Sequence, residues 1–505
     1  MGRIRFFKAA KPDVKTQNRK SLRLSLFFST AQQYTALLIT IPSMMILSRL
    51  LTPAQIGVYS VAIAFVNLVH MLRDLGTSEY LVQSASLEDD IARSAFTVTL
   101  IMAWALAVVL FVASPWVALF FDEKGLGAVL RILCLTYLLL PIGSTVNAML
   151  IREMEFGLRY KINTAQVLVQ NLVTISLAWF GWGYFSPAWG AVAGMLATIS
   201  GCFYWAGHYR IRGLSLAHWR PITKFGLNQT AGSVMQRLGE SAPDFVIGRV
   251  LGFAQVGLYS RGFGLVRMFR DNISGAVGSV TFSAFSHRHR NGGGANELYL
   301  RSITFITGLG WPFLGFASFM AFPIIRIFFG DQWDEAVPIL RLLAIQGMLS
   351  LIVIHFQELL TGTGRVGLAT ALTGAWQGTL VAALLLAAPF GLVAVASSLI
   401  PATVITVIIV MVCLAYTVQI QLSSFMSALW PSTVLSFCAL VPVAISRYVY
   451  PPGVDALWGP LITAGLGLIA GSVVGGWLSS HPLWHEIKGF LIKRLTGCSA
   501  TPNES

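Results

Sequence analysis

The stretch LSRLLTPAQIGVYS at residues 47–60 returns 200 residues later as IGRVLGFAQVGLYS at residues 247–260. The two stretches align without a gap, and chance matching of apolar sequence would favour only Leu, Val and Ala. Seven of the fourteen positions are identical, among them Arg49/Arg249, Gly57/Gly257 and Tyr59/Tyr259. The chain is therefore predicted to contain an internal duplication. The matched arginines begin the repeated loops, which favours a structural role, such as binding a helix C-terminus, over a substrate role.

The composition around this repeat is that of a membrane protein. Of the 505 residues, 55% are hydrophobic and only 11% are charged, whereas a soluble protein has roughly 25% charged residues. The apolar residues occur in blocks of helical length, well beyond the ~10-residue strands of an outer-membrane barrel. These observations predict an all-α integral membrane protein that crosses the membrane many times.

The apolar blocks number about fourteen, although some merge or split and a count of twelve or thirteen stays open. The predicted spans lie near 26–48, 56–82, 94–119, 126–151, 164–181, 187–209, 228–248, 256–284, 301–326, 336–361, 366–388, 391–418, 427–449 and 456–479. Six spans separate the two copies of the repeat, so both copies have the same orientation across the membrane. This predicts two parallel six-helix lobes around a central cavity, plus two C-terminal helices.

The domain boundaries follow from this division. They are a basic N-terminus at 1–25, an N-lobe at 26–209, a linker at 210–227, a C-lobe at 228–418, two further spans at 427–479 and a tail at 480–505.

Loop charges predict which side of the membrane each end occupies. The net charge is +14, and eight basic residues against one acid lie in the first 25 residues, which favours a cytoplasmic N-terminus over nucleic-acid binding. With an even number of spans, the basic linker 210–227 and the C-terminal tail are cytoplasmic as well. The acidic loops around Asp122 and Asp331 lie on the opposite side, as the positive-inside rule requires.

Each ionisable residue inside a predicted span raises the free energy of membrane insertion by about 2.5–3.5 kcal/mol. Such residues are therefore expected to face a cavity or each other. Several share one helical face within their span. They are Arg237, Glu240 and Asp244 in 228–248, Arg267, Arg270 and Asp271 in 256–284, His70, Arg73 and Asp74 in 56–82, and His355 with Glu358 in 336–361. The span 164–181 offers the polar residues Gln170 and Asn171.

Several motifs resemble those of one transporter family, the polysaccharide-transport branch of the multidrug/oligosaccharidyl-lipid/polysaccharide exporter superfamily. They are the stretch 47–60, RDLG at 73–76 followed by Gln83, GLYSR at 257–261, SAFS at 283–286 and GDQWDEAVP at 330–338. The resemblance covers about the first ten spans. It implies an inner-membrane flippase that moves an undecaprenyl-pyrophosphate-linked oligosaccharide from the cytoplasmic to the periplasmic leaflet by alternating access. The implied partners are this substrate, membrane lipids, and polysaccharide polymerase or export proteins, with no nucleic acid.

The resemblance gives the buried charges a candidate role. Arginine binds phosphate oxygens through its planar fork of donors, so Arg237, Arg267 and Arg270 would attract the pyrophosphate. Acidic neighbours would moderate that binding or couple it to ions, and amide side chains would contact sugar hydroxyls. The acidic set is Glu240, Asp244, Asp271, Asp74 and Glu358, and the amides are Gln170 and Asn171. The alternative is that these residues form ion pairs that only hold helices together.

Two other functions stay open at this point. An ion-coupled multidrug exporter of the same fold would need a dedicated cation site, and the arginines make a cationic drug an awkward substrate. A membrane-embedded polysaccharide polymerase or ligase would need a sizeable periplasmic loop with catalytic residues, and the outside loops are short. The sequence has no nucleotide-binding or metal-binding motif. We therefore expect no enzymatic activity, no cofactor and no ATP hydrolysis.

Overall fold

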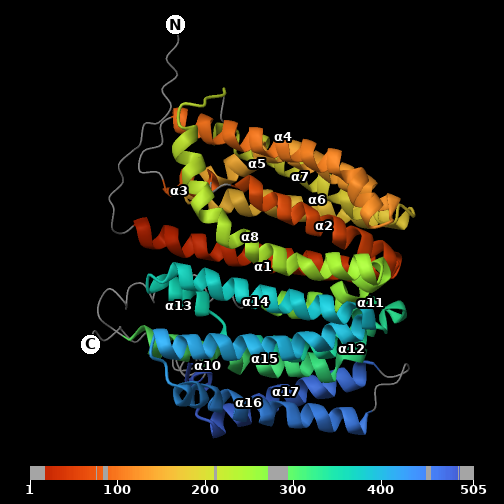
Figure 1. The fold of residues 1–505 in the computed structure, drawn as a ribbon, viewed down its shortest axis with the longest axis vertical. Coiled ribbons are helices and arrows are strands. Elements are labelled where there is room, and N and C mark those ends of the chain that lie inside the picture. Colours follow the sequence, from red (N-terminus) through yellow and green to blue (C-terminus); the bar gives the residue numbers. More distant parts are fainter. Residues whose placement is uncertain are drawn as a thin grey trace. The chain divides into compact units, whose positions relative to one another are not determined.

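The structure, a computed structural model, describes residues 17–74, 77–83, 89–209, 213–270, 294–450, 457–486 and 488. The regular elements among these residues are all helices (Figure 1). Nine helical stretches in this part of the chain are long and apolar enough to cross a membrane, by their length and composition. The prediction of an all-α, multi-pass membrane protein is therefore confirmed.

Each predicted span overlaps a helix in the described part of the chain, although several ranges run past a helix end or a break, and the range 256–284 is described only to 270. The first eight ranges fall on the following elements: α1 Gln17–Leu50, α2 Pro53–Asp74, α4 Asp89–Phe120, α5 Lys124–Arg152, α6 Phe156–Trp179, α7 Phe185–Trp205, α8 Trp219–Val250, and a helix at 253–270. Two short helices, α3 at Thr77–Gln83 and η1 at Gly207–Tyr209, lie between them.

The last six predicted ranges fall on a second set of helices. These are α10 Ala295–Phe319, the broken run α12 Ala336–Ser350, η3 Leu351–Val353 and α13 Phe356–Gly362, then α14 Val366–Ala387, α15 Leu392–Thr417, α16 Leu422–Val449 and α17 Trp458–Leu478. Short helices α11 Ala321–Phe329, η2 Asp331–Trp333 and η4 Ala388–Phe390 connect them. Five of the predicted ranges fall on helices whose described residues are not long and apolar enough to be counted as membrane spans, and these are α1, α6, α7, α8 and 253–270. The count of fourteen therefore stays a prediction, as does the division into six plus six plus two.

The described chain divides into two compact units. One holds the described residues of 1–50 and 66–231, and the other holds those of 51–65 and 232–505. In the first unit, α6 packs on both α1 and α7, and α5 packs on both α4 and α7. Leu126, Leu130 and Tyr137 of α5 are fully buried there, and the hydroxyl of Tyr137 donates a hydrogen bond to the Val66 carbonyl of α2.

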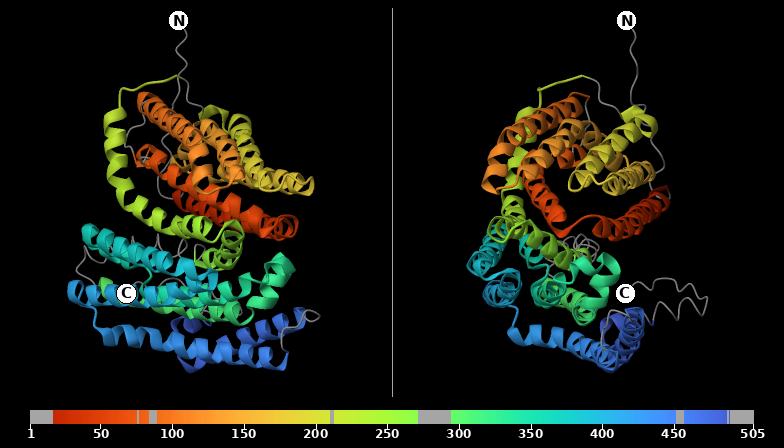
Figure 2. Two further views of the ribbon diagram at one scale, coloured as in Figure 1. Left: turned by 45° about the vertical axis from the view of Figure 1, so that its right-hand side comes forward. Right: turned by 90° about the vertical axis from the view of Figure 1, so that its right-hand side faces the viewer.

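In the second unit, α10 lies between two neighbours, α12 and α16, and α15 packs on α12 and α14. Figure 2 shows α16 and α17 side by side in both views, and the hydroxyls of Ser446 and Thr463 lie 2.7 Å apart between them. The apolar core of this unit includes Tyr299 and Phe425, whose rings meet edge to face. The C-terminal pair of helices is thus joined to the rest of this unit through α10.

A buried polar cluster joins α10, α16 and the segment after α17. The Thr307 hydroxyl donates to Ser432, which lies 3.1 Å from Nε2 of His481. The backbone N–H of Leu483 donates to Nδ1 of His481, so this imidazole is neutral with its proton on Nε2. Because His481 is fully buried, the segment after α17 is anchored in the core of the unit.

The duplicated stretch has a reciprocal geometry within the second unit. At the start of α2, the Thr52 N–H donates to Gln55 Oε1 and the Gln55 N–H donates to Thr52 Oγ1, which makes a capping box with Pro53 as the first helical residue. A Cβ built on Gly57 would lie 1.8 Å from the Phe253 carbonyl oxygen. A Cβ built on Gly257 would lie 2.0 Å from the Pro53 carbonyl oxygen. The matched glycines therefore hold the two copies in direct backbone contact.

The two matched arginines lie in the last turns of their helices, Arg49 in α1 and Arg249 in α8. A positive charge is favourable at this end because the helix dipole leaves it partly negative. The structural role predicted for them stays a prediction.

Candidate functional site

The second unit contains a break in a helix that would otherwise cross the membrane. The stretch Ala336–Gly362 has the length and apolarity of one span, but α12 ends at Ser350 and α13 begins at Phe356. Between them His355 adopts a left-handed backbone conformation with φ of 66°. This conformation is uncommon for a residue other than glycine, and such positions occur often at functional sites. Broken membrane helices are likewise typical of transporter binding sites.

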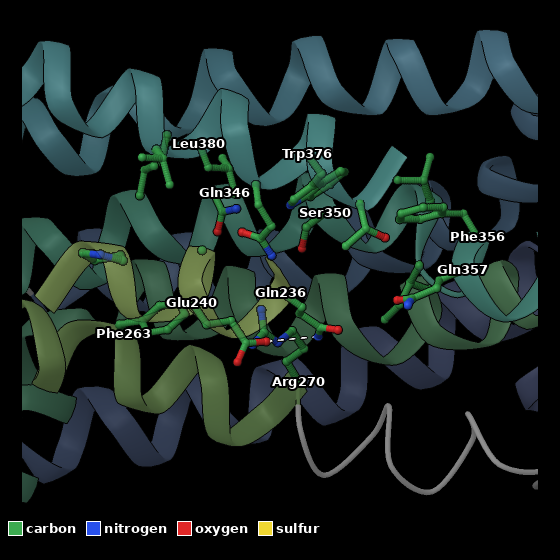
Figure 3. A pocket seen from close by; sticks show the side chains of 18 of the residues that line it. Gln236, Glu240, Phe263, Arg270, Gln346, Ser350, Phe356, Gln357, Trp376 and Leu380 are labelled. Carbon is green, nitrogen blue, oxygen red and sulfur yellow. Dashed lines mark hydrogen bonds between the residues drawn. The ribbon is translucent and has the colours of Figure 1, made fainter. Parts of the chain in front are cut away.

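A cavity of about 350 Å³ lies at this break, inside the second unit (Figure 3). Helix α8, the helix 253–270, the broken run α12–α13 and helix α14 all contribute side chains to it. The polar and aromatic residues in its wall are Gln236, Glu240, Tyr259, Phe263, Arg270, Gln346, Ser350, His355, Phe356, Gln357, Glu358, Thr373, Trp376 and Gln377. Its volume is at the lower end of the ~300–1,000 Å³ usual for ligand pockets.

The acidic side chains of this pocket have partners. Glu240 accepts hydrogen bonds from Gln236 Nε2 and Arg237 Nη1, each at 3.2 Å, and Figure 3 shows Gln236 and Glu240 side by side in the wall. Nδ1 of His355 lies 3.4 Å from Oε1 of Glu358, as their spacing in the sequence predicted. The carboxylates are thereby held in place, which is a requirement for a site that orients a ligand.

Aromatic rings form two pairs along the same wall. Trp376 of α14 stacks on Phe356 of α13 with ring centroids 6.4 Å apart and an interplanar angle of 26°. Tyr259 stacks on Phe263 at 5.7 Å and 24°, and the guanidinium of Arg270 lies 6.0 Å from the Phe263 ring centroid. The pocket therefore combines flat apolar faces with hydrogen-bonding groups.

The structure brings part of the predicted site together. Glu240, Arg270 and Glu358 line the pocket, and Tyr259 of the repeat joins them. Arg237 is not among the residues that line the pocket. Its side chain is about half exposed and contacts Glu240, which does line it.

Two further members of the predicted set lie close to that pocket. Arg267 lines a small neighbouring cavity that shares Arg270 and Gln346 with the pocket. Asp244 lies within electrostatic reach of Arg267.

Other predicted residues lie elsewhere. Gln170 and Asn171 belong to α6 in the first unit, where Asn171 Nδ2 donates to the Val167 carbonyl at 2.8 Å. Gln170 lies against α7, because a Cβ built on Gly194 would be 2.9 Å from its Cβ. Asp74 is the last residue of α2, but its side chain lies outside the described part of the chain, and so does the whole of Asp271.

Sequence reasoning missed the glutamines and the tryptophan of this pocket. Gln346 and Gln377 stand in apolar helices, and Gln236 lies beside the charged Arg237 and Glu240, so a search for intramembrane ions passed over these uncharged amides. The signal that could have found them is the presence of polar amides inside three different predicted spans. Gly239 has a part here too, since a Cβ built on it would lie 2.2 Å from Oε1 of Gln377.

The fold of the chain matches those of two solved structures. The solved structure of the lipid II flippase MurJ in its inward closed conformation matches with a TM-score of 0.70 at 13% identity, over 89% of this chain and 99% of that one. An inward-facing multidrug resistance MATE family transporter of the MOP superfamily matches with a TM-score of 0.62 at 15% identity, over 75% of this chain and 93% of that one.

The sequence assigns the chain to a family within that fold. The profile of the family described as "Polysaccharide biosynthesis protein" matches residues 46–338, which include both copies of the repeat and the motif at 330–338. The chain belongs to the polysaccharide biosynthesis protein family, which confirms the resemblance seen in its motifs.

Three curated relatives are similar over part of their length. The teichuronic acid biosynthesis protein TuaB of Bacillus subtilis is 25% identical over 314 residues, 59% of this chain and 62% of that protein. The lipopolysaccharide biosynthesis protein WzxC of Escherichia coli is 23% identical over 64% of this chain and 66% of its own. The succinoglycan biosynthesis transport protein ExoT of Rhizobium meliloti is 26% identical over 61% of this chain and 62% of its own. The chain thus spans just under two thirds of the length of these relatives.

Proposed function

We propose that this protein moves a lipid-linked oligosaccharide across the bacterial inner membrane, from the cytoplasmic to the periplasmic leaflet, for the synthesis of an exported polysaccharide. The observation that carries the proposal is the family match over residues 46–338. It is supported by three relatives named for polysaccharide biosynthesis or transport, and by a fold shared with a flippase for another lipid-linked glycan. The N- and C-termini are cytoplasmic in this proposal, and polymerase and export proteins act on the product.

The charged residues have separate roles in the proposal. Arg237, Arg267 and Arg270 attract the pyrophosphate through charge-assisted hydrogen bonds. Acidic neighbours weaken that binding enough for release or couple it to an ion, and these are Glu240, Asp244, Asp271, Asp74 and Glu358. Two of the arginines support this assignment by their place at or beside the pocket. Gln170 and Asn171 remain candidates for sugar contacts.

The test is a translocation assay with purified protein in liposomes. An undecaprenyl-pyrophosphate-linked oligosaccharide is placed in the membrane, and its appearance on the far side is followed by a lectin that cannot cross. We expect translocation that depends on the protein and that falls by about tenfold or more in each of Arg237→Ala, Arg267→Ala and Arg270→Ala. The control is Arg301→Ala, because Arg301 is exposed and its contact to Glu486 is long, at 3.9 Å.

Two results would count against the proposal in different ways. No translocation by the folded wild-type protein, in either direction, would reject the flippase function. Full activity in all three variants would reject only the role of the arginines.

A multidrug exporter is the second candidate, favoured by the acidic pocket wall and by the MATE-like fold. Increased resistance of a sensitive strain to ethidium, abolished by Glu358→Gln, would support it instead.

A further inference from the structure

The strongest unexplained feature of the described residues is the imidazole of His355. Only 1% of this side chain is exposed, and it lines the pocket. Its Nδ1 lies 3.4 Å from Oε1 of Glu358, but its Nε2 is buried and has no hydrogen-bond partner among the described residues. A buried polar atom without a partner costs about 1–3 kcal/mol, so such an atom at a cavity wall indicates a ligand group that would satisfy it.

The charge of the wall narrows the ligand class. Among the described residues, the charged side chains that line the pocket are Glu240, Glu358 and Arg270. Arg237 pairs with Glu240 at 3.2 Å, so positive and negative side chains balance along this wall. A neutral group that forms hydrogen bonds needs no excess charge, so the wall favours an uncharged part of a lipid-linked glycan.

The neutral groups of the wall fit a sugar ring. Gln346 Nε2 donates to Thr403 Oγ1 at 3.0 Å, which holds the amide in place while its carbonyl oxygen remains an acceptor. Gln236 is held in the same way by Glu240. Planar rings such as Trp376 offer an apolar face to the C–H groups of a pyranose, and fixed amides can form hydrogen bonds with its hydroxyls. Ligand pockets usually combine apolar walls with a few polar groups in this way.

We infer that this pocket of the second unit binds an uncharged hexopyranosyl unit, with Nε2 of His355 hydrogen-bonded to a sugar hydroxyl and Trp376 against the ring face. The inference rests on the proposed function, because it assigns the glycan part of that substrate to this pocket. It assigns the glycan to residues of the second unit, whereas Gln170 and Asn171 belong to the first. A volume of about 350 Å³ holds roughly one or two sugar rings rather than a whole oligosaccharide.

The left-handed backbone of His355 provides a matched pair of variants. Asparagine tolerates this conformation, and its amide nitrogen replaces Nδ1, so His355→Asn keeps the contact to Glu358 and removes only the group at Nε2. In His355→Gln the longer amide reaches the position of Nε2 instead. Trp376→Leu removes the ring face, whereas Trp376→Phe keeps a smaller one. Gln421→Leu is the control, because Gln421 is exposed at the start of α16 and lies outside the pocket.

The experiment measures binding of soluble probes to the whole protein in lipid nanodiscs by saturation-transfer difference NMR. The probes are cellobiose, cellobiouronic acid and inorganic pyrophosphate. We expect cellobiose to bind, and its Kd to rise about tenfold in His355→Asn and Trp376→Leu but not in His355→Gln or Gln421→Leu. Cellobiouronic acid should bind more weakly than cellobiose, and Glu358→Gln should reduce that difference.

The outcomes separate this inference from the proposed function. Equal cellobiose binding by wild type and His355→Asn, or stronger binding of pyrophosphate that the same variant abolishes, would overturn the inference while translocation in liposomes still stood. Loss of activity in His355→Gln and His355→Asn alike, with unchanged cellobiose binding, would instead assign His355 to proton coupling and also overturn it. If the variants change cellobiose binding as predicted but the protein shows no translocation, the sugar-binding role of the pocket would stand and the flippase function would be rejected.

Discussion

Gly57 and Gly257 are 200 residues apart, and each lies against the backbone of the helix that carries the other. Gly57 meets Phe253, the first residue of the helix 253–270, and Gly257 meets Pro53, the first residue of α2. Phe253 and Pro53 are themselves a matched pair in the repeat. Such reciprocity is expected when two similar elements meet about a local two-fold axis. The duplication is therefore present in the structure as a contact between the two copies, and not only as sequence similarity.

The first prediction concerns this contact. Gly57→Ala and Gly257→Ala place a Cβ about 2 Å from a carbonyl oxygen that cannot rotate away, so the helices must separate. We expect each variant to lose about 1–3 kcal/mol of stability, measured as a lower Tm of the detergent-solubilised protein. Gly378→Ala is the control, because no atom lies within 4 Å of its Cβ, and it should be neutral or slightly stabilising. An unchanged Tm in both repeat variants would mean that this contact does not contribute to stability.

The second prediction concerns the motif at residues 330–338. Arg326 binds Asp334 through two parallel hydrogen bonds of 2.7 and 2.6 Å, which positions the loop between α11 and α12. Bidentate, charge-assisted pairs are stronger than ordinary surface pairs, so Arg326→Gln, Asp334→Asn and the double variant should show a measurable coupling in thermal unfolding, with the Tm losses of the two single variants adding up to more than the Tm loss of the double variant. The exposed pair Arg93 and Asp89, 4.0 Å apart, is the reference, and its coupling should be near zero. Equal coupling in both pairs would contradict the prediction.

The third prediction is a loss of stability in acid through His481. Burial lowers the pKa of this imidazole from 6.5 to about 4, so it stays neutral in the fold while the unfolded chain binds a proton below pH 6.5. A lowered pKa for a histidine means that its contribution is fully present above pH 6.5 and is lost as the pH falls toward 4. Between pH 7.5 and pH 5 we expect a loss of about 2 kcal/mol, seen as a lower Tm.

Two variants isolate this histidine from the others. His481→Asn keeps an acceptor for the Leu483 N–H but does not titrate, so its Tm should change less between pH 7.5 and pH 5. His485→Asn removes an exposed histidine of the same segment and should leave the pH dependence as it is in the wild type. If the two variants behave alike, the acid sensitivity has another source.

The fourth prediction uses the space beside the pocket. In Gly239→Ala the added methyl group would lie 2.2 Å from Oε1 and 2.8 Å from Cβ of Gln377, so both the amide and the adjacent part of α14 must shift. We therefore expect a lower Tm, a displaced Gln377, and cellobiose binding weaker by about tenfold. Gly367→Ala in α14 is the matched control, because its Cβ would meet nothing within 4 Å. Weakened binding in the control, or normal binding in Gly239→Ala, would show that the pocket does not depend on this contact.

Much of the fold could be predicted from the residues alone. A membrane helix needs about 20 apolar residues and satisfies its backbone hydrogen bonds internally, so each span is a local property of its own segment. That is why every predicted range falls on a helix, including those such as α6 that are too polar to count as spans by composition. The repeat could also be detected in the sequence, because the two copies align at a fixed offset of 200 residues.

The pocket required the tertiary structure. Charges such as Glu240 and Glu358 are conspicuous in apolar sequence, but which of them share a cavity depends on how α8 packs against the run α12–α13. Gln170 and Asn171 looked equally suitable and lie in the other unit. Helical periodicity places residues on a face of one helix and says nothing about which helix that face meets.

The sequence alone determined the class of molecule, the positions of its helices and the duplication, because hydrophobicity, helix length and repeat spacing are encoded locally. The tertiary structure alone decided that Gly57 and Gly257 meet, that the helix breaks at His355, and that Gln346 and Trp376 face one cavity. These features arise from contacts between segments far apart in the chain. The left-handed conformation of His355 is the clearest case, since histidine adopts it only in a small minority of positions and the sequence does not mark this one.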